Sequence, residues 1–212
     1  MSNIIKIFKL NTLIIKPYIK SIVYITIIPI LLVISSKSLT SAIIATMTLL
    51  ALRGTSLIFQ IEEKENIVKF YNLIPVKKSQ LVIGRYIFII ILGLSTLIAS
   101  LLIQSIILIN MGVNIIIIDS FILGITVYFL SISLQVPGFY KFGSINGSIF
   151  VYIPIIIFFI INYLIGSLDI IGLNPILYIL DNQNLIYIIL LIFSIISLGI
   201  SLIISMKIFE KK

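Results

Sequence analysis

The side chains of this sequence that could carry out chemistry are few, and several catalytic types are missing. The chain has no His and no Cys, which excludes His acid–base catalysis, Cys nucleophiles and ordinary zinc sites. It also lacks the Gly-x-x-x-x-Gly-Lys-Ser/Thr loop that holds nucleotide phosphates. The seven acidic residues form no catalytic constellation. We therefore expect no enzyme activity of its own, no metal and no directly bound cofactor.

The polar segment 60–85 carries the most informative spacing. The i, i+3, i+4, i+7 pattern of one apolar helix face is formed by Ile67, Phe70, Tyr71 and Ile74. Acidic residues load the first turn, where the helix dipole favours negative charge, and Pro75 ends the helix. An amphipathic helix of this kind lies on lipid or docks into a groove of another protein, and the pattern alone leaves both open. A solvated loop that only joins two spans is the third reading.

Polar residues inside apolar stretches are a second set of candidates. Arg53 lies about two turns before the predicted cytoplasmic end of its stretch, where a charge usually faces protein or a water-filled cavity. Snorkelling to the headgroups is an equal alternative. Gln104 and Gln135 bond between helices or line a pathway, and helix-to-helix bonding is the favoured interpretation. Three acidic residues are interpreted as solvated loop ends, with outer-gate or cation contacts as the minor alternative, namely Asp119, Asp169 and Asp181.

These candidates belong to a chain that is too apolar for water. Hydrophobic residues make up 60% of it and charged residues 10%, whereas a soluble domain carries about 25% charged residues. A chain of this composition is embedded in lipid or aggregates. We therefore predict an all-α integral membrane protein, with residues 1–212 as a single transmembrane domain.

Six stretches are suitable for membrane helices, which need about 20 mostly apolar residues. They cover residues 21–36, 41–59, 86–109, 121–136, 149–164 and 185–205. The fourth stretch is short and can start near Ile115. The fold prediction is thus six transmembrane helices, interrupted by one sizeable polar segment between the second and third.

The net charge of +8 is distributed unevenly along the chain. With six spans, the basic residues before the first span, between the second and third, between the fourth and fifth, and after the sixth all face one side. The other side holds Lys37 as its one basic residue. The positive-inside rule then places both termini in the cytoplasm. We read this charge as a topology signal in a plasma membrane and not as a nucleic-acid site. The abundance of Ile, Asn and Lys indicates a low-GC bacterium.

Residues 2–17 are predicted to form a helix on the cytoplasmic membrane surface. At about 100° per residue, one face carries Lys6, Lys9 and Lys16. The opposite face carries Ile4, Phe8 and Ile15. Pro17 then stops or kinks the helix before the first span. This pattern fits an interfacial helix, and the alternative is a simple extension of the first span.

The segment from Phe59 to Tyr86 contains the runs Glu62-Glu63-Lys64, Ile74-Pro75-Val76-Lys77-Lys78 and Leu81-Val82-Ile83-Gly84-Arg85-Tyr86. Together these runs resemble the acidic and Leu-Pro-Val-Ser-Arg region of type-2 ABC exporter permeases. In that family an acidic stretch, a short helix and a Pro-containing turn separate the second and third spans, and a basic residue and a Tyr open the third. Here Ile74 replaces the usual Leu, and two Lys residues replace Ser-Arg.

A second match lies after the fourth predicted span. The run Pro137-Gly138-Phe139-Tyr140-Lys141-Phe142-Gly143 resembles the Pro…Lys-Phe-Gly turn of small bacterial members. The basic ending from Met206 to Lys212 is similar to their tail. The resemblance covers the whole chain in span order. These small members include permeases of phenol-soluble modulin and other peptide exporters.

The resemblance implies a function and a set of partners. In that family the helix between the second and third spans is a coupling helix that docks on a separate ATPase subunit. Its apolar face would lie in the ATPase groove, and the implied polar contacts around it are Glu62, Glu63, Lys64 and Glu65. Two ATPase copies would bind ATP and Mg²⁺, and a second permease subunit, identical or different, would complete the pathway. The implied activity is ATP-driven export of amphipathic peptides, such as antimicrobial or toxin peptides, or of similar hydrophobic cargo.

Other function classes stay open from the residues alone. A stand-alone channel or secondary transporter usually has intramembrane carboxylates or broken helices at the midplane, and neither is evident in this sequence. A membrane enzyme lacks candidate residues. A bacteriocin-immunity membrane protein is a further alternative, because peptide exporters often confer immunity.

Overall fold

A computed structural model describes residues 3–65, 76–113, 117–153, 156 and 183–211. Every element within these residues is a helix, so the all-helical fold predicted from the sequence is confirmed. In chain order they are α1 Asn3–Ile15, η1 Lys16–Tyr18, α2 Ile19–Ser36, α3 Leu39–Leu50, η2 Ala51–Thr55, α4 Ser56–Lys64, α6 Lys78–Asn110, α7 Ile117–Gly147, η3 Ser148–Val151 and α10 Gln183–Glu210.

Four of the described helices are long and apolar enough to cross a membrane. They are Leu39–Lys64, Lys78–Asn110, Ile117–Gly147 and Ile186–Glu210, which coincide with the predicted second, third, fourth and sixth spans. At the predicted first span, the structure has the shorter apolar stretch Ile27–Ser36 within α2. Most of the predicted fifth span lies outside the described residues. The count of six spans therefore stays a prediction.

The helices extend beyond the apolar stretches that predicted them. The second span continues as α4 to Lys64, and α6 begins at Lys78, eight residues before the predicted start of the third span at residue 86. The 33 residues of α6 measure about 50 Å at 1.5 Å per residue, more than the roughly 30 Å of hydrocarbon in a bilayer. At its far end, Gly112 has a φ of 71°, and the Val113 N–H donates to the Leu108 carbonyl at 3.1 Å. This is a glycine-terminated helix end.

The predicted turn at Pro137–Gly143 is wrong in its position. Pro137 lies inside α7, and the helix continues to a break at Gly143, where φ is 83° and ψ is −178°. A positive φ of this size favours glycine. The sequence prediction ended the helix too early because membrane helices tolerate Pro where neighbouring groups satisfy the freed backbone.

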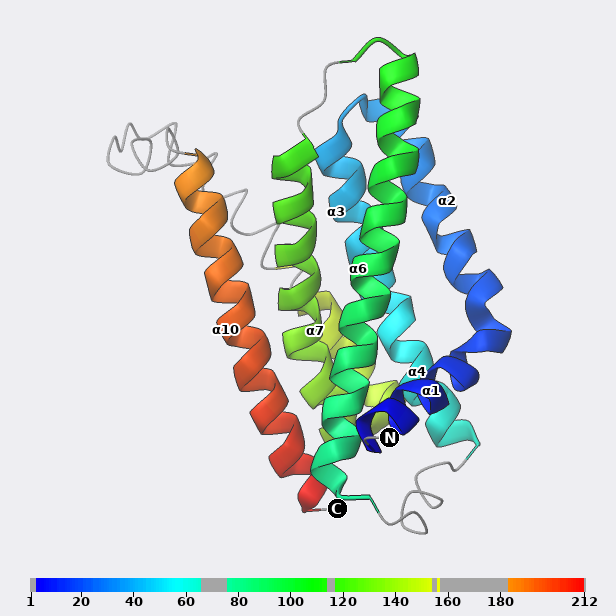
Figure 1. The fold of residues 1–212 in the computed structure, drawn as a ribbon, viewed down its shortest axis with the longest axis vertical. Coiled ribbons are helices and arrows are strands. Elements are labelled where there is room, and N and C mark those ends of the chain that lie inside the picture. The colour runs from blue at the N-terminus through cyan, green and yellow to red at the C-terminus, as the bar shows by residue number, and fades with distance from the viewer. Residues whose placement is uncertain (1–2, 66–75, 114–116, 154–155, 157–182, 212) are drawn as a thin grey trace.

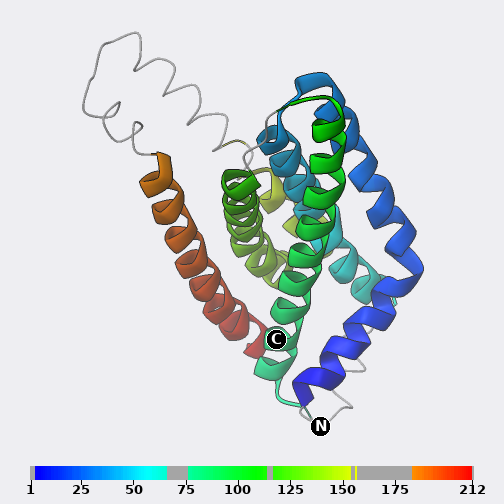
Figure 2. The ribbon, with the colours of Figure 1, turned by 45° about the horizontal axis from the view of Figure 1, so that its top comes forward.

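The span helices lie side by side, and α1 crosses one end of them (Figures 1 and 2). The pairs in contact include α10 with α7, α3 with α7, α3 with α6, and α2 with α3. The core between them is apolar and includes Ile43, Met47, Leu97, Leu108 and Ile132. Close approach of α6 and α7 depends on Gly93, because a side chain there would overlap the ring of Tyr128.

Basic residues gather at one end of the molecule, which we call the basic end. The start of α1 and the end of α10 lie there together with the last turn of α4, the first turn of α6 and the final turns of α7 (Figure 1). These segments carry Lys64, Lys78, Lys141 and Lys207. The opposite end, where α2 turns into α3, carries Lys37 in a left-handed conformation with a φ of 53°.

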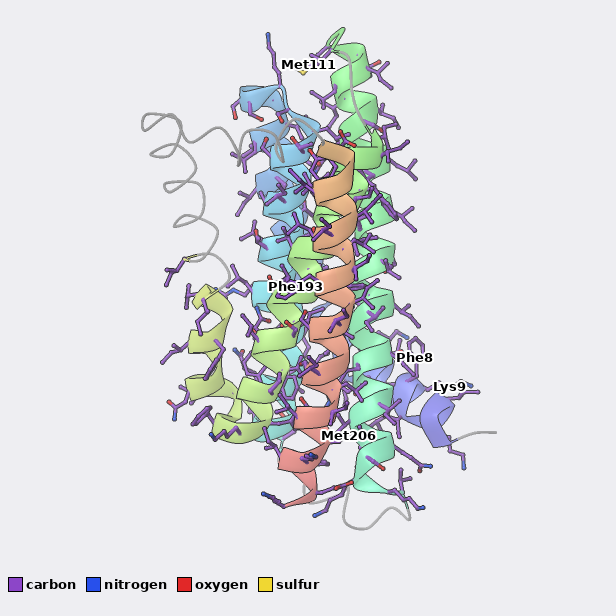
Figure 3. All side chains as sticks on the ribbon, turned by 90° about the vertical axis from the view of Figure 1, so that its left-hand side faces the viewer. Phe8, Lys9, Met111, Phe193 and Met206 are labelled. Carbon is purple, nitrogen blue, oxygen red and sulfur yellow. The ribbon has the colours of Figure 1, made fainter. Side chains whose placement is uncertain are left out.

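The predicted surface helix is α1, which packs on α6 at the basic end. Its buried residues Ile7 and Ile15 are 7% and 3% exposed, and a side chain at Gly84 of α6 would lie 2.7 Å from Ile7. Phe8 packs edge-on against Phe88 at 5.5 Å between ring centroids. Figure 3 shows Lys9 pointing away from the bundle. The helix is thus docked on the span helices along one face, and its location at the membrane surface stays a prediction.

Candidate functional site

A buried ion pair joins the end of α4 to the start of α6. A guanidinium Nη2 of Arg85 donates to Oε1 of Glu62, and the two side chains are 5% and 4% exposed. Glu62 belongs to the last turn of α4, and Arg85 lies about two turns into α6. Since α4 leads into the segment 66–75 and α6 begins shortly after it, the pair fixes the two helices on either side of the predicted coupling segment.

Aromatic rings enclose the guanidinium of Arg85. Its central carbon lies 4.8 Å from the ring centroid of Phe59 and 5.4 Å from that of Tyr140. Its Nη1 also donates to the Tyr140 hydroxyl at 3.1 Å. Cations over aromatic faces are stabilised by the ring quadrupole, more strongly where water is excluded. We call Phe59, Glu62, Arg85 and Tyr140 the junction cluster.

The aromatic members of the junction cluster extend it to α7 and α10. Phe59 stacks on Phe139 with 4.8 Å between centroids and meets Tyr140 edge-on at 5.3 Å. Tyr140 in turn contacts Phe209 of α10 at 5.2 Å. One contiguous set of side chains therefore connects the ends of α4, α6, α7 and α10.

The burial of both charges makes the junction cluster a rigid connection. Removing two charges from water costs several kcal/mol each, and the cost is offset only when the charges pair with each other in good geometry. Leaving one partner alone in the same place costs about 3–5 kcal/mol. A movement that pulled the ends of α4 and α6 apart would meet this penalty, so the two ends are expected to move together.

Glu63 makes a second contact between α4 and α7. Its Oε2 accepts a hydrogen bond from the backbone N–H of Ser144 at 2.8 Å. Ser144 follows the break at Gly143, where a side chain atom would lie 3.4 Å from the Glu63 carboxylate. The carboxylate thus holds the turn of the predicted Lys-Phe-Gly motif against α4, next to the junction cluster.

The residues predicted to contact an ATPase divide into three groups in the structure. Glu62 is 3% exposed and faces the interior, and Glu63 bonds to α7. Lys64 and Glu65 are exposed at the end of α4. The apolar face of the coupling helix lies outside the described residues, namely Ile67, Phe70, Tyr71 and Ile74. The docking role of all these residues stays a prediction.

Both glutamines within the spans bond to the second span. Gln104 is 1% exposed, and its Nε2 donates to Thr46 Oγ1 at 3.0 Å. Gln135 is fully buried, and its Oε1 accepts from Thr55 Oγ1 at 2.7 Å. These are interhelix contacts from α6 and α7 to the second span. Arg53, the third polar candidate inside the spans, is exposed on the surface of η2.

Sequence reasoning missed the internal roles of Arg85 and Tyr140. It interpreted Arg85 as a topology charge and as the basic residue that opens the third span, and it placed Tyr140 in a turn. A signal was present: Arg85 follows the apolar run Leu81–Gly84 and precedes a Tyr, so it lies on a buried stretch of helix. A charge in such a position needs a partner of opposite sign.

Tyr86, which the family match placed at the opening of the third span, joins two helices through its hydroxyl. Its hydroxyl lies 2.7 Å from the hydroxyl of Ser201 and 2.8 Å from that of Ser205. These contacts join α6, at the residue that follows Arg85, to the last three turns of α10. Across the described residues, no group of three or more His, Cys, Asp or Glu side chains could hold a metal ion.

Comparison with known proteins gives one match. A family model described as ABC-2 family transporter protein matches residues 6–210. No curated protein and no solved structure matches the chain. The matched range includes every residue of the junction cluster and all four span helices.

Proposed function

The chain belongs to the ABC-2 transporter family, and on that premise we propose that it is the permease subunit of an ATP-driven exporter for amphipathic peptides or similar hydrophobic cargo. The match over residues 6–210 and the four span helices support a membrane subunit of an ABC transporter. The choice of peptide cargo and of outward transport is supported by the resemblance to small peptide-exporter permeases.

The energy source in this proposal is a separate ATPase subunit. The sequence has no phosphate-binding loop, so ATP and Mg²⁺ are held by the partner. Two ATPase copies act on two permease subunits, and the second permease is another copy of this chain or a related one. Together the two permeases enclose the transport pathway.

The junction cluster is the observation that carries the proposed coupling. It joins the helices on both sides of the segment 66–75 to α7 and α10. When ATP closes the two ATPase subunits, the coupling helix moves with them. The ion pair between Glu62 and Arg85 passes that movement to both flanking helices, and the aromatic contacts pass it to the rest of the bundle.

The proposed orientation follows from the basic end. Lys64, Lys78, Lys141 and Lys207 belong to helix ends that lie together there. Positively charged flanks remain in the cytoplasm during insertion. The coupling segment and both termini then face the ATPase, in the plasma membrane of a low-GC bacterium.

The docking of the coupling helix is tested with an aromatic pair. The chain is co-expressed with the ATPase encoded beside it, purified in lipid nanodiscs, and assayed for co-purification and stimulated ATP hydrolysis. We expect the double variant Phe70→Ala with Tyr71→Ala to lose most of the stimulation, because the docking face loses its two largest side chains.

A matched control removes the same residue types elsewhere. Phe193 and Tyr152 are 59% and 57% exposed away from the coupling segment, and Figure 3 shows Phe193 partway along α10. Replacing both by Ala should leave stimulation intact. If the coupling pair and the control pair behave alike, the docking role is wrong, and failure of any ATPase to co-purify argues against the transporter assignment.

Cargo and direction need a transport measurement. Inside-out vesicles containing the complex are mixed with a fluorescent amphipathic peptide and ATP. Outward transport in the cell appears here as ATP-dependent accumulation of the peptide in the vesicle lumen. Robust ATP hydrolysis without accumulation would exclude this cargo, and release of preloaded peptide would reverse the direction.

A further inference from the structure

The exposed side chains of the span Leu39–Lys64 are polar. In this stretch, which the structure describes completely, the exposed residues are Ser41, Arg53, Gln60, Glu63 and Lys64. No large hydrophobic side chain of this stretch is exposed. Three of the five lie at its basic end, whereas Arg53 lies well inside the span.

The other span helices present the opposite kind of surface. On α6, Ile98 and Leu102 are 53% and 60% exposed, and on α10 the exposed residues are mainly Ile. Such surfaces suit the hydrocarbon of a bilayer. A polar surface at the same depth does not, so the exposed side of the second span faces something other than lipid chains.

The π-helical turn η2 brings these polar residues onto one face. In a uniform α-helix at about 100° per residue, Arg53 would lie about 120° around the axis from Ser41. A π turn bonds residue i to i+5 and so holds one residue more than an α turn. This unwinding of about 100° is spread over the turn Ala51–Thr55, so Arg53 at its centre lies about 70° from Ser41, and the residues beyond the turn are set back by the full 100°.

The same geometry aligns two further residues. Thr48 lies about 20° from Ser41, and Gln60, beyond η2, returns to nearly the angle of Ser41, so all four residues lie within an arc of about 90°. Thr48 is half-buried, and its hydroxyl donates back to the Ala45 carbonyl at 2.9 Å. We call Ser41, Thr48, Arg53 and Gln60 the polar stripe, which follows the second span over most of its length.

Arg53 lies at a depth where a charge needs water or a partner. Along the axis it is about 21 Å from Leu39 and about 17 Å from Lys64 at 1.5 Å per residue, within a span that crosses roughly 30 Å of hydrocarbon. Charges so far inside usually face a bundle interior or a water-filled cavity. Over the described parts of the chain, its guanidinium forms no ion pair or hydrogen bond.

We propose that the polar stripe lines a water-filled part of the transport pathway and that Arg53 binds the anionic group of the transported amphiphile. The inference rests on the proposed transport function. A water-filled pathway removes the cost of exposing Arg53, and a positive charge without an acidic partner among the described residues is complementary to an anion. The planar guanidinium suits a carboxylate or a phosphate, each of which can accept two parallel hydrogen bonds.

Water access is tested with single cysteines, since the chain has none of its own. The reporters are Thr48→Cys and Gln60→Cys in the permease–ATPase complex. The second span and α6 run antiparallel, and the contacts of Gln104 with Thr46 and of Arg85 with Glu62 show which of their residues lie at the same height. Leu102→Cys and Ile87→Cys therefore serve as controls of matched height on the exposed face of α6.

The stripe cysteines should react at least about tenfold faster than their controls with the membrane-impermeant anion sulfonatoethyl methanethiosulfonate, because the thiolate forms only where water reaches it. Ser41→Cys is a third reporter, nearer the opposite end of the span, and should react as fast as the other two. Equal, slow reaction at stripe and control positions would overturn the pathway assignment. Normal ATPase assembly in the same samples would show that the proposed function survives that result, whereas loss of assembly would challenge the function itself.

The charge of Arg53 is tested by comparing two reagents of opposite sign. At Thr48→Cys, about 7 Å away along the axis, Arg53 should favour the sulfonate reagent over the trimethylammonium reagent. Arg53→Gln should lower that preference roughly five- to tenfold in water, and Arg53→Lys should keep it. An unchanged ratio in Arg53→Gln would show that Arg53 does not face the same water.

Anion binding is tested by protection of Thr48→Cys. Dodecanoate carries a carboxylate, dodecyl phosphate a phosphate, and dodecyl maltoside no charge. Protection by either anion that disappears in Arg53→Gln supports the site, and the effective anion identifies the source, a peptide-like carboxylate or a lipid-like phosphate. Equal protection by the neutral amphiphile, or by none, would overturn anion recognition at Arg53.

Discussion

Glu62 and Arg85 bury opposite charges between the ends of α4 and α6, and each charge is tolerated there because it is paired with the other. The carboxylate is held by a guanidinium that also contacts Phe59 and Tyr140. If one partner is removed, the other charge stays buried among apolar groups without compensation. The loss of stability then comes mainly from that remaining charge.

A double-mutant cycle tests this pairing. We expect Arg85→Met to lower the free energy of unfolding by about 3–5 kcal/mol, because Glu62 then stays buried without its cation. Glu62→Gln should cost a comparable amount. Combined, the two substitutions should cost clearly less than the sum of the single effects, measured as thermal stability of the purified protein in nanodiscs.

Lys64→Met provides the matched control, since Lys64 is exposed and lies only two residues from Glu62. Its effect should remain within about 0.5 kcal/mol. Strict additivity of the Glu62 and Arg85 variants would mean that the contact contributes nothing beyond its separate residues.

At the scale of elements, the crossing of α6 and α7 depends on small residues and one tyrosine. The Tyr128 ring lies over Gly93, and its hydroxyl donates to the Ile89 carbonyl at 2.9 Å. Gly124 of α7 similarly admits Ile43 and Leu97 at close range. Membrane helices associate through close packing of this kind, because lipid supplies little hydrophobic drive between them.

Gly93→Ala should therefore destabilise the bundle by about 1–3 kcal/mol, the usual cost of overpacking. The matched control is Gly199→Ala on α10, where a new methyl group meets nothing within 4 Å and the helix gains propensity. Thermal unfolding of both variants in the same lipid gives the comparison. Similar melting temperatures for the two would show that α6 and α7 can separate to admit a methyl group.

Apolar stretches in the sequence predicted the elements well, since four of them coincide with the span helices. Their ends were less predictable. Pro137 suggested a turn, but the backbone in lipid continues helical until Gly143 permits a positive φ. Likewise, no residue type in Ala51–Thr55 specifies the i to i+5 turn that the structure has there.

The candidate site was predictable in location but not in chemistry. The sequence indicated the segment 60–85 as a polar run between apolar stretches, and it indicated the run Pro137–Gly143 through its resemblance to a family motif. The bond from Arg85 to Glu62 spans 23 residues, and that from Arg85 to Tyr140 spans 55. Contacts of such separation depend on how helices cross, which periodicity along a single helix does not encode.

For the molecule as a whole, the basic end defines a direction through the membrane. Reporter fusions measure it: alkaline phosphatase should be active after Gly112 and at Lys37, and a cytoplasmic fluorescent reporter should be active after Lys211. The physical reason is retention of Lys-rich flanks in the cytoplasm. Phosphatase activity after Lys211 would reverse the orientation or change the number of spans.

The buried pair between α4 and α6 also has a consequence for biogenesis. Each charge alone makes it less favourable for its helix end to move from the translocon into lipid. Docked against each other, the two ends present one neutral, aromatic-covered surface. We therefore expect the second and third spans to leave the translocon as a hairpin, so that the contact proposed to couple motion during transport first favours correct insertion of the two spans.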